Sequence, residues 1–138
     1  MDDNSIFIEK LRLSGLRPTI QRLEICKLLF DRKKTFHFTI NDISKILKNN
    51  TYKKISLATI YNTVHSFKKK GYLKEISVNK DKSYFDTNTS DHHHFLDINT
   101  NELIDLKKED VDKIRIKKNL PGKKINSIEV LVKIENNN

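Results

Sequence analysis

Apolar residues recur at intervals of three and four through the first half of the chain, which is the spacing of one face of a helix. The pattern predicts a helix around Ile6 to Leu13, a second from Ile20 to Leu29, a third after Thr39 and a fourth from Leu57 to Lys70. Hydroxyl side chains that can cap a helix stand before the last three: Thr19, Thr39 and Ser56. Glycines that suit a helix end follow the first and the fourth: Gly15 and Gly71.

The fourth predicted helix has two unlike faces. Its apolar stripe is made of Leu57, Ile60, Val64 and Phe67. The other side is polar but almost free of charge, whereas a plain solvated face is normally rich in Lys and Glu. Small hydroxyls, an amide, a methyl and a phenol suit base edges in a DNA major groove. The residues that would read DNA are Ala58, Thr59, Tyr61 and Asn62.

Two short strands, 73–78 and 83–86, follow this helix and are joined by a turn that contains Lys80 and Lys82. Helices followed by a basic hairpin are the winged form of the helix-turn-helix, in which the hairpin meets phosphate or the minor groove. Lys80 and Lys82 are therefore predicted DNA contacts. The alternative is a helical core domain without a nucleic-acid role.

The second half changes character. A hairpin is predicted from strands 95–98 and 102–105, then a helix from Lys107 to Leu120, then a strand over 125–134. The predicted fold class is α+β, with a winged helix-turn-helix domain in residues 1–86, a hinge at 87–91 and a small α/β domain in 92–138. A unit of this size is marginal alone, so a homodimer through residues 95–134 is expected.

The net charge of +9 is concentrated in the first half. Residues 1–86 contain 18 Lys and Arg against 9 Asp and Glu, while residues 87–138 contain 9 of each. A basic globular domain favours nucleic acid as its partner, here double-stranded DNA. Improved solubility alone is the alternative explanation.

Composition limits the location of the protein. No stretch approaches the about 18 apolar residues of a membrane-spanning helix, and the start of the chain lacks the apolar run of a signal peptide. A single cysteine, Cys26, excludes an internal disulfide. We expect a soluble, cytoplasmic protein without membrane contact.

Three consecutive histidines, His92 to His94, offer metal chemistry. Side chains alternate in an extended segment, so His92 and His94 share one face and His93 points to the other. Asp86 lies an even number of residues before both. One carboxylate and two imidazoles suit zinc, iron(II), manganese or nickel. A solvated histidine-rich loop is the alternative.

Several segments together resemble the ferric uptake regulator (Fur) family of cytoplasmic, metal-responsive transcription factors. They are Gly15-Leu16-Arg17-Pro18-Thr19, the segment from Ser56 to Thr63 that includes Ala58-Thr59-Ile60-Tyr61-Asn62, Tyr84-Phe85-Asp86 and Asp91-His92-His93-His94. The resemblance runs from about Leu11 to Ile134. It implies a homodimer that binds a DNA operator, with a regulatory site made of His37, Asp86, His92, His94 and Asp105. The metal would be iron, manganese or zinc.

Departures from the family narrow the expectation. Asp97 and Thr100 stand where the family often has a Cys-x-x-Cys motif, so no structural four-cysteine zinc site is expected. A further family metal site would draw on Asp91, His93, Asp112 and Asn126, and an amide is a weak ligand.

The triple histidine and Asn62 look most like the iron-response-regulator branch, whose members respond to iron through haem. His92, His93 and His94 would then bind haem, and the protein would be a repressor in iron homeostasis and haem metabolism.

Two other functions stay open. One is a metal-dependent enzyme that uses the same five side chains, although three histidines and two carboxylates nearly fill a coordination shell and leave little room for substrate. The other is a sensor of peroxide or of another metal within the same family. We expect a regulator and not an enzyme.

Overall fold

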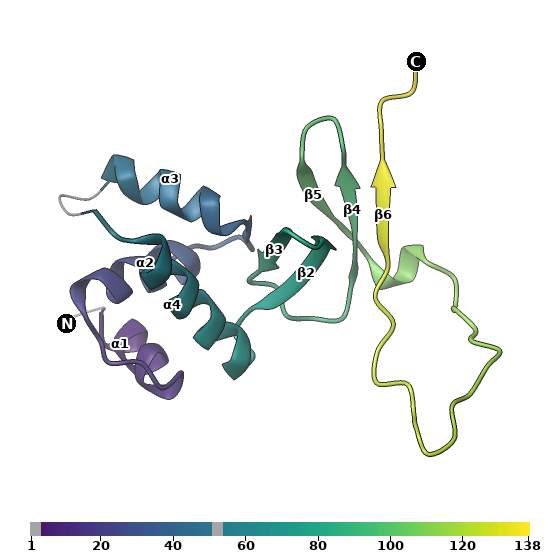
Figure 1. Cartoon of the computed structure of the whole chain (residues 1–138), viewed down its shortest axis with the longest axis horizontal. Helices are drawn as coiled ribbons and strands as arrows, with labels where there is room; N and C mark the ends of the chain where they lie inside the picture. Colours follow the sequence, from purple (N-terminus) through teal and green to yellow (C-terminus); the bar gives the residue numbers. More distant parts are fainter. Residues whose placement is uncertain (1–3, 51–53) are drawn as a thin grey trace. The chain divides into compact units, whose positions relative to one another are not determined.

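The computed structural model describes residues 4–50 and 54–138. The chain divides into two compact units, residues 1–89 and 90–138. The first contains helices and a small sheet, and the second contains a sheet and one short 3-10 turn (Figure 1). The predicted α+β fold class is confirmed by this arrangement and by the fold relatives described below. No helix among the described residues is long and apolar enough to cross a membrane.

The first unit begins with helices α1 (Asn4–Leu13) and α2 (Ile20–Phe30) and ends with α3 (Ile40–Asn50), α4 (Leu57–Lys70) and a β-hairpin. The hairpin pairs β2 (Lys74–Asn79) with β3 (Lys82–Asp86). All four predicted helices and both strands are confirmed. The polar residues 48–54 suggest a loop, but residues 48–50 are the last residues of α3, and residues 51–53 lie outside the described residues.

Local chemistry fixes the helix ends as predicted. Thr39 and Asp42 form a reciprocal capping box, with Thr39 N donating to Asp42 Oδ2 at 2.9 Å and Asp42 N donating to Thr39 Oγ1 at 3.1 Å. Ser56 Oγ accepts from Thr59 N at 3.1 Å and starts α4. Gly71 ends α4 with a φ of 95°, a left-handed conformation that a side chain would strain.

The core of the first unit lies among α1, α2, α3, α4 and the inner faces of the strands. Its fully buried side chains are Leu11, Ile25, Cys26, Leu29, Phe38, Ile43, Ile60, Val64 and Phe67. One position of the predicted apolar stripe of α4 was wrong, because Leu57 is the first residue of the helix and is 53% exposed.

A short strand that the sequence pattern did not indicate, β1 (His37–Phe38), completes the first sheet in the order β1-β3-β2. It pairs His37 with Asp86 and Phe38 with Phe85. Phe38 and Phe85 stack with ring centroids 5.6 Å apart. Thr87 donates from its N–H to the carbonyl of Phe36, and Phe36 N donates to Thr87 Oγ1. His37 is therefore held in a strand rather than in a free loop.

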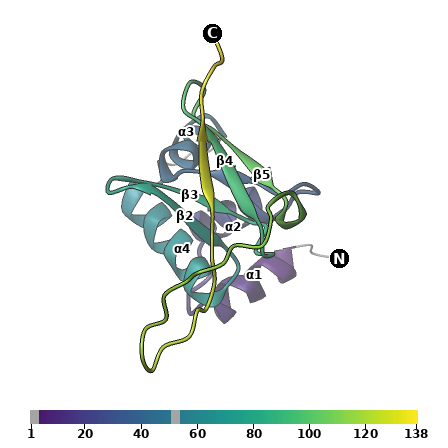
Figure 2. The ribbon, with the colours of Figure 1, turned by 90° about the vertical axis from the view of Figure 1, so that its right-hand side faces the viewer.

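The second unit is a three-stranded sheet in the order β5-β4-β6. Strands β4 (His93–Asp97) and β5 (Glu102–Leu106) form the predicted hairpin. Strand β6 (Leu131–Ile134) runs parallel to β4 on its other side (Figure 2). The predicted last strand was too long, because only its final residues are paired.

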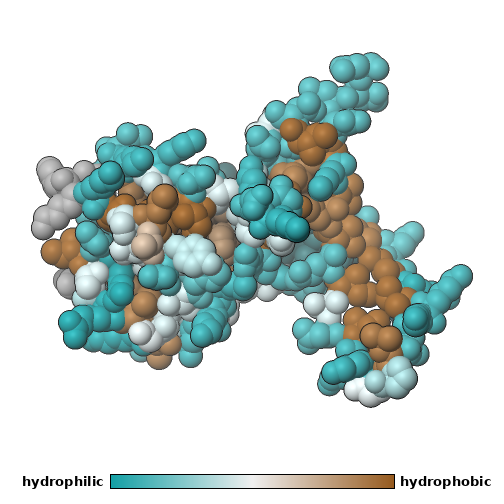
Figure 3. Space-filling view, viewed as in Figure 1, coloured by the Kyte–Doolittle hydropathy of each residue, from teal (hydrophilic) through white to brown (hydrophobic). Residues whose placement is uncertain are grey.

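The predicted helix from Lys107 to Leu120 was wrong. Only a single 3-10 turn, Lys108–Asp110, is present, and the chain between it and β6 is irregular. The apolar residues of this irregular segment are exposed: Ile114, Ile116, Leu120 and Ile125. Apolar side chains gather on the surface of this segment (Figure 3). A helix of this length depends on packing of its apolar face, and β-branched residues lose side-chain freedom in it.

Candidate functional site

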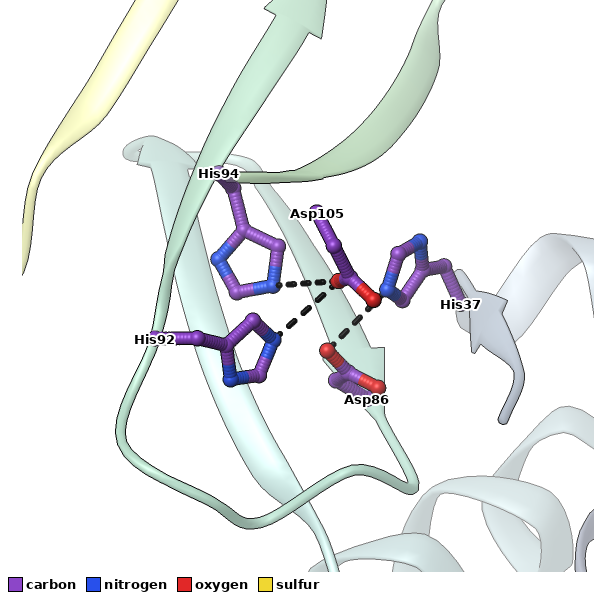
Figure 4. A group of neighbouring side chains, drawn as sticks. All are labelled: His37, Asp86, His92, His94 and Asp105. Carbon is purple, nitrogen blue, oxygen red and sulfur yellow. Dashed lines mark hydrogen bonds and ion pairs between the residues drawn. The ribbon is translucent and has the colours of Figure 1, made fainter. Parts of the chain in front are cut away.

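His37 and Asp86 form a pair across strands β1 and β3 of the first unit. His37 Nε2 lies 3.0 Å from Asp86 Oδ2 (Figure 4). The Asp86 side chain is fully buried, and its other oxygen, Oδ1, accepts from Asn88 N at 2.8 Å. A carboxylate removed from water in this way requires a cationic or hydrogen-bonding partner. The pairing of the two strands supplies one.

A second group of the same chemistry lies in the second unit. His94 and Asp105 are partners in the β4–β5 register, and His92 immediately precedes β4. Asp105 Oδ1 lies 3.1 Å from His92 Nε2 and 3.5 Å from His94 Nε2 (Figure 4). Both histidines are buried, while the Asp105 side chain is 38% exposed. Two imidazoles therefore converge on one carboxylate oxygen.

The tautomer of His92 bears on what this group can bind. His92 Nδ1 lies 2.7 Å from the carbonyl oxygen of Ser90, and a carbonyl only accepts, so Nδ1 carries the proton. In neutral His92, the lone pair of Nε2 then faces a carboxylate oxygen, and two acceptors repel. A proton or a metal ion between them removes the repulsion. Histidines that bind metals commonly donate their other ring N–H to a carbonyl in this way.

His93 is turned to the other side of β4, as alternation requires. Its Nδ1 accepts from Val130 N at 3.1 Å, and this hydrogen bond connects β4 to the segment that leads into β6. It also lines a pocket of about 300 Å³ with Asp91, Lys108 and Asp112. Asp91 pairs with the ammonium of Lys108 at 3.1 Å, an arrangement that opposes the further metal site at this place.

Cys26 does not belong to a metal group. It is fully buried in α2, and burial raises the pKa of its thiol to about 11 despite the nearby charge of Lys10. A thiol with this pKa is protonated at neutral pH, and the thiolate is the form that binds metals. Asp97 and Thr100 stand at the end of β4, where Asp97 Oδ1 accepts from the N–H groups of Asn99 and Thr100.

The uncharged face of α4 is open to solvent. Ala58, Tyr61 and Asn62 are exposed, with Tyr61 52% exposed, and Thr59 is half-buried. The buried side of the same helix packs Ile60, Val64 and Phe67 into the core. The helix thus presents a polar face on a rigid element.

Basic side chains flank this face. Lys68, Lys69 and Lys70 are exposed at the end of α4, and Lys80 is exposed in the turn of the hairpin. Lys82 is half-buried, with its ammonium 5.2 Å from the centre of the Tyr84 ring. The sequence pattern did not indicate one feature here, the contact of the His65 ring with the rings of Tyr61 on α4 and Phe85 on β3.

A helical unit that carries a basic hairpin and an uncharged helix face, followed by a small sheet with histidines turned to carboxylates, defines a metal-responsive transcriptional regulator. The comparison with known proteins makes the class specific. A profile of the ferric uptake regulator family matches residues 13–133, and the chain belongs to that family.

Two relatives illustrate the sequence similarity. The peroxide operon regulator of Bacillus subtilis (strain 168) is 33% identical over 107 residues, which are 78% of this chain and 72% of that protein. The peroxide-responsive repressor PerR of Staphylococcus epidermidis is 33% identical over 107 residues, 78% of this chain and 69% of that protein. The relatives are regulators, and the expectation that the chain is not an enzyme is confirmed. The narrower resemblance to the iron-response-regulator branch has no support from these names.

Solved structures share the fold. The ferric uptake regulator of Vibrio cholerae matches with a TM-score of 0.68 and 19% identity, over 93% of this chain and 98% of that one. The ferric uptake regulator of Pseudomonas aeruginosa with manganese matches with a TM-score of 0.64 and 20% identity over the whole of both chains.

Proposed function

We propose that the protein is a metal-dependent repressor that binds a palindromic DNA operator as a homodimer in the cytoplasm. Residues 1–86 would bind DNA as a winged helix, 92–138 would form the dimer, and 87–91 would be the hinge. The single observation that carries the metal dependence is the geometry of His92, whose Nε2 faces the Asp105 carboxylate while Nδ1 is committed to Ser90.

His37, Asp86, His92, His94 and Asp105 would hold one divalent ion together. Three imidazole nitrogens and two carboxylate oxygens suit iron(II), manganese or zinc. Neither group is a complete donor set alone, because the first offers two donors and the second offers three. A bound ion would place positive charge beside both carboxylates.

Ligation from both units would connect the metal to DNA binding. His37 and Asp86 lie in the strands beside α4, and His92, His94 and Asp105 lie in the unit proposed to dimerise. A dimer binds a palindromic operator well only when the distance between its two recognition helices matches the distance between the two half-sites. The ligands can favour the DNA-binding arrangement only as far as they bind the metal more tightly in that arrangement.

The face of α4 made of Ala58, Thr59, Tyr61 and Asn62 would read bases in the major groove. The absence of charge in this set and the exposure of Tyr61 support a role in reading bases. Lys80 and Lys82 would bind phosphates, which adds affinity that falls with salt and carries little sequence information.

Dimerisation through residues 95–134 has support from what the second unit leaves exposed. Its sheet has three strands, so β5 and β6 are edges. Ile114, Ile116, Leu120 and Ile125 are exposed in the segment between them. A second copy that covers these side chains would bury apolar surface that one copy cannot. Sedimentation at micromolar concentration should give the dimer, and a monomer with intact operator binding would contradict it.

Peroxide is a second candidate signal, because the relatives described above are named for it. Cys26 is buried and has a raised pKa, so a peroxide response would have to arise at the metal ligands. A peroxide sensor should lose operator binding after peroxide treatment only when it is loaded with a redox-active metal. Equal loss in the zinc-loaded protein would contradict this route.

Haem at His92, His93 and His94, with a role in iron homeostasis and haem metabolism, is the narrower hypothesis. The three rings do not present one face: His92 and His94 turn to Asp105, and His93 accepts from Val130. Haem would have to displace these contacts, so we rank it below a divalent metal. Titration with haem should give no Soret shift, and a saturable shift lost in His93→Gln would reverse this ranking.

The proposal as a whole is tested by metal binding in competition with a chelator. The full chain should bind one manganese or iron(II) ion per protomer, and His94→Ala should bind none. His93→Gln is the matched control, because its amide oxygen can still accept from Val130 and it lies on the other face of β4. Equal binding by His94→Ala and the unchanged chain would show that the proposed ligands are wrong.

A further inference from the structure

The ring of Tyr61 rests on the ring of His65, one turn later on α4. The two ring centroids are 4.2 Å apart and the planes meet at 39°. Residues four apart lie above one another on a helix, so this contact is part of the helix face itself. Tyr61 is 52% exposed, whereas His65 is half-buried beneath it. The side chain proposed to read bases therefore has an aromatic support.

His65 is in turn held from the other side by the first sheet. Its ring meets the edge of Phe85 on β3, with centroids 6.1 Å apart and planes at 78°. Phe85 is 2% exposed and stacks on Phe38 of β1. Phe38 and Phe85 are the residues next to His37 and Asp86 in those strands. The contacts run without a gap from the β1–β3 pair through His65 to Tyr61.

We infer that His65 is a positioning residue that fixes the Tyr61 ring in the orientation that reads DNA, and so determines sequence specificity without touching a base. The inference rests on the proposed role of α4 as the DNA-reading helix. An exposed tyrosine at a helix surface samples several rotamers, and binding must select one of them. A ring in contact beneath it restricts the rotamers of Tyr61 before DNA binds, which is preorganisation of the binding surface.

The burial and the contacts of His65 fit this role. It is half-buried, while Tyr61 above it is exposed, and its edge contact with Phe85 connects its ring to the sheet. The neighbouring hydroxyls of this helix are committed to their own backbone, since Thr63 Oγ1 donates to the Thr59 carbonyl and Ser66 Oγ donates to the Asn62 carbonyl. They give no support to the Tyr61 ring.

The test compares His65→Ala with His65→Phe in the full chain, each with and without Tyr61→Ala. Affinity is measured for a selected operator and for an unrelated duplex. His65→Ala should weaken operator binding roughly 2- to 12-fold, the range of one aromatic pair, and leave the unrelated duplex unchanged. His65→Phe should restore the operator affinity. His65→Ala added to Tyr61→Ala should cause no further loss of operator affinity, because the Tyr61 ring that His65 positions is already absent.

Three outcomes distinguish a failure of the proposed base-reading role of Tyr61 from a failure of the positioning role of His65. If Tyr61→Ala does not weaken operator binding, the base-reading role of Tyr61 is wrong, and this inference falls with it. If Tyr61→Ala weakens binding but His65→Ala does not, only the positioning role is wrong. If the two losses add, or if His65→Phe fails to rescue although its thermal unfolding matches the unchanged chain, His65 acts through the fold and the inference is overturned.

Discussion

Replacement of Asp105 by Asn should separate metal binding from the stability of the metal-free fold. Asp105 Oδ1 faces His92 Nε2 at 3.1 Å and His94 Nε2 at 3.5 Å. Asn has the same shape, and its amide N–H₂ can donate to the lone pair of His92 Nε2. Because the Asp105 side chain is 38% exposed, we expect the metal-free protein to lose at most about 1 kcal/mol of unfolding free energy.

The metal-loaded protein should behave differently. Changes to groups that only support a ligand cost roughly 10- to 100-fold in metal affinity, so loss of a direct carboxylate ligand should cost at least about 100-fold. At a metal concentration about 1,000 times the dissociation constant of the unchanged chain, metal stabilises the fold by about 4.1 kcal/mol. A 100-fold weaker site would give about 1.4 kcal/mol at the same concentration, a difference of about 2.7 kcal/mol.

The assay is denaturant unfolding of both proteins with manganese and with a chelator. His93→Gln serves as the control, since it removes a neighbouring imidazole from the opposite face of β4. The reasoning is refuted if Asp105→Asn keeps the full manganese stabilisation, or if it is destabilised equally in chelator and in manganese. The second outcome would mean that Asp105 is a structural carboxylate.

The remaining predictions concern DNA contacts, one ion pair and the thiol. Tyr61→Ala should weaken operator binding by about 1–3 kcal/mol and leave binding to random DNA unchanged. Lys80→Ala should weaken binding to both duplexes and reduce the slope of affinity against salt by about 1. Equal losses for Tyr61→Ala on both duplexes in a mobility-shift assay would argue against base contact. Burial alone would raise the pKa of Glu75, but hydrogen bonds from Lys68 and Ser83 hold it below 4.5. A lowered pKa stabilises the fold above the unfolded value and is lost as pH falls through the folded value, so Glu75→Gln should cost about 0.2–1 kcal/mol at pH 7 in chemical denaturation and nothing at pH values below the folded pKa. A cost that persists in acid would assign the effect to packing. Cys26 should resist alkylation at pH 8 until the protein unfolds, and rapid labelling of the folded chain would contradict its burial.

Features set by neighbouring residues were predictable from the sequence. The caps at Thr39 and Ser56 and the turn at Gly71 depend on contacts within four residues, and the structure has them as expected. The alternation of His92, His93 and His94 depends only on strand geometry.

Features set by distant pairing were not predictable in this way. Strand β1 has two residues and exists because it pairs with Asp86 and Phe85, far along the chain. The contact of His65 with Phe85 depends on the same sheet, so no pattern along α4 could indicate it. The wrong helix at 107–120 shows the opposite failure, because helical spacing indicates a helix only where a surface exists to bury its apolar face.

The candidate metal ligands show the same contrast between local and distant features. Spacing alone linked Asp86, His92 and His94, whereas His37 and Asp105 were indicated only by the family resemblance. In the structure, His37 faces Asp86, and Asp105 faces the two histidines of β4 and its approach. His37 and Asp105 reach the other ligands through the register of antiparallel strand pairs, and a pattern in one local segment does not indicate which strands pair.

The central claim, that metal bound by this chain controls its affinity for DNA, is tested most directly by measuring operator affinity with and without metal. A duplex selected from random sequence by the manganese-loaded protein serves as the operator. The account predicts that a chelator lowers affinity for this duplex by roughly 5- to 150-fold, the range of coupling between two linked sites, and that manganese restores it. Operator affinity that is the same in chelator and in manganese, in a protein that binds one manganese ion per protomer, would contradict the account.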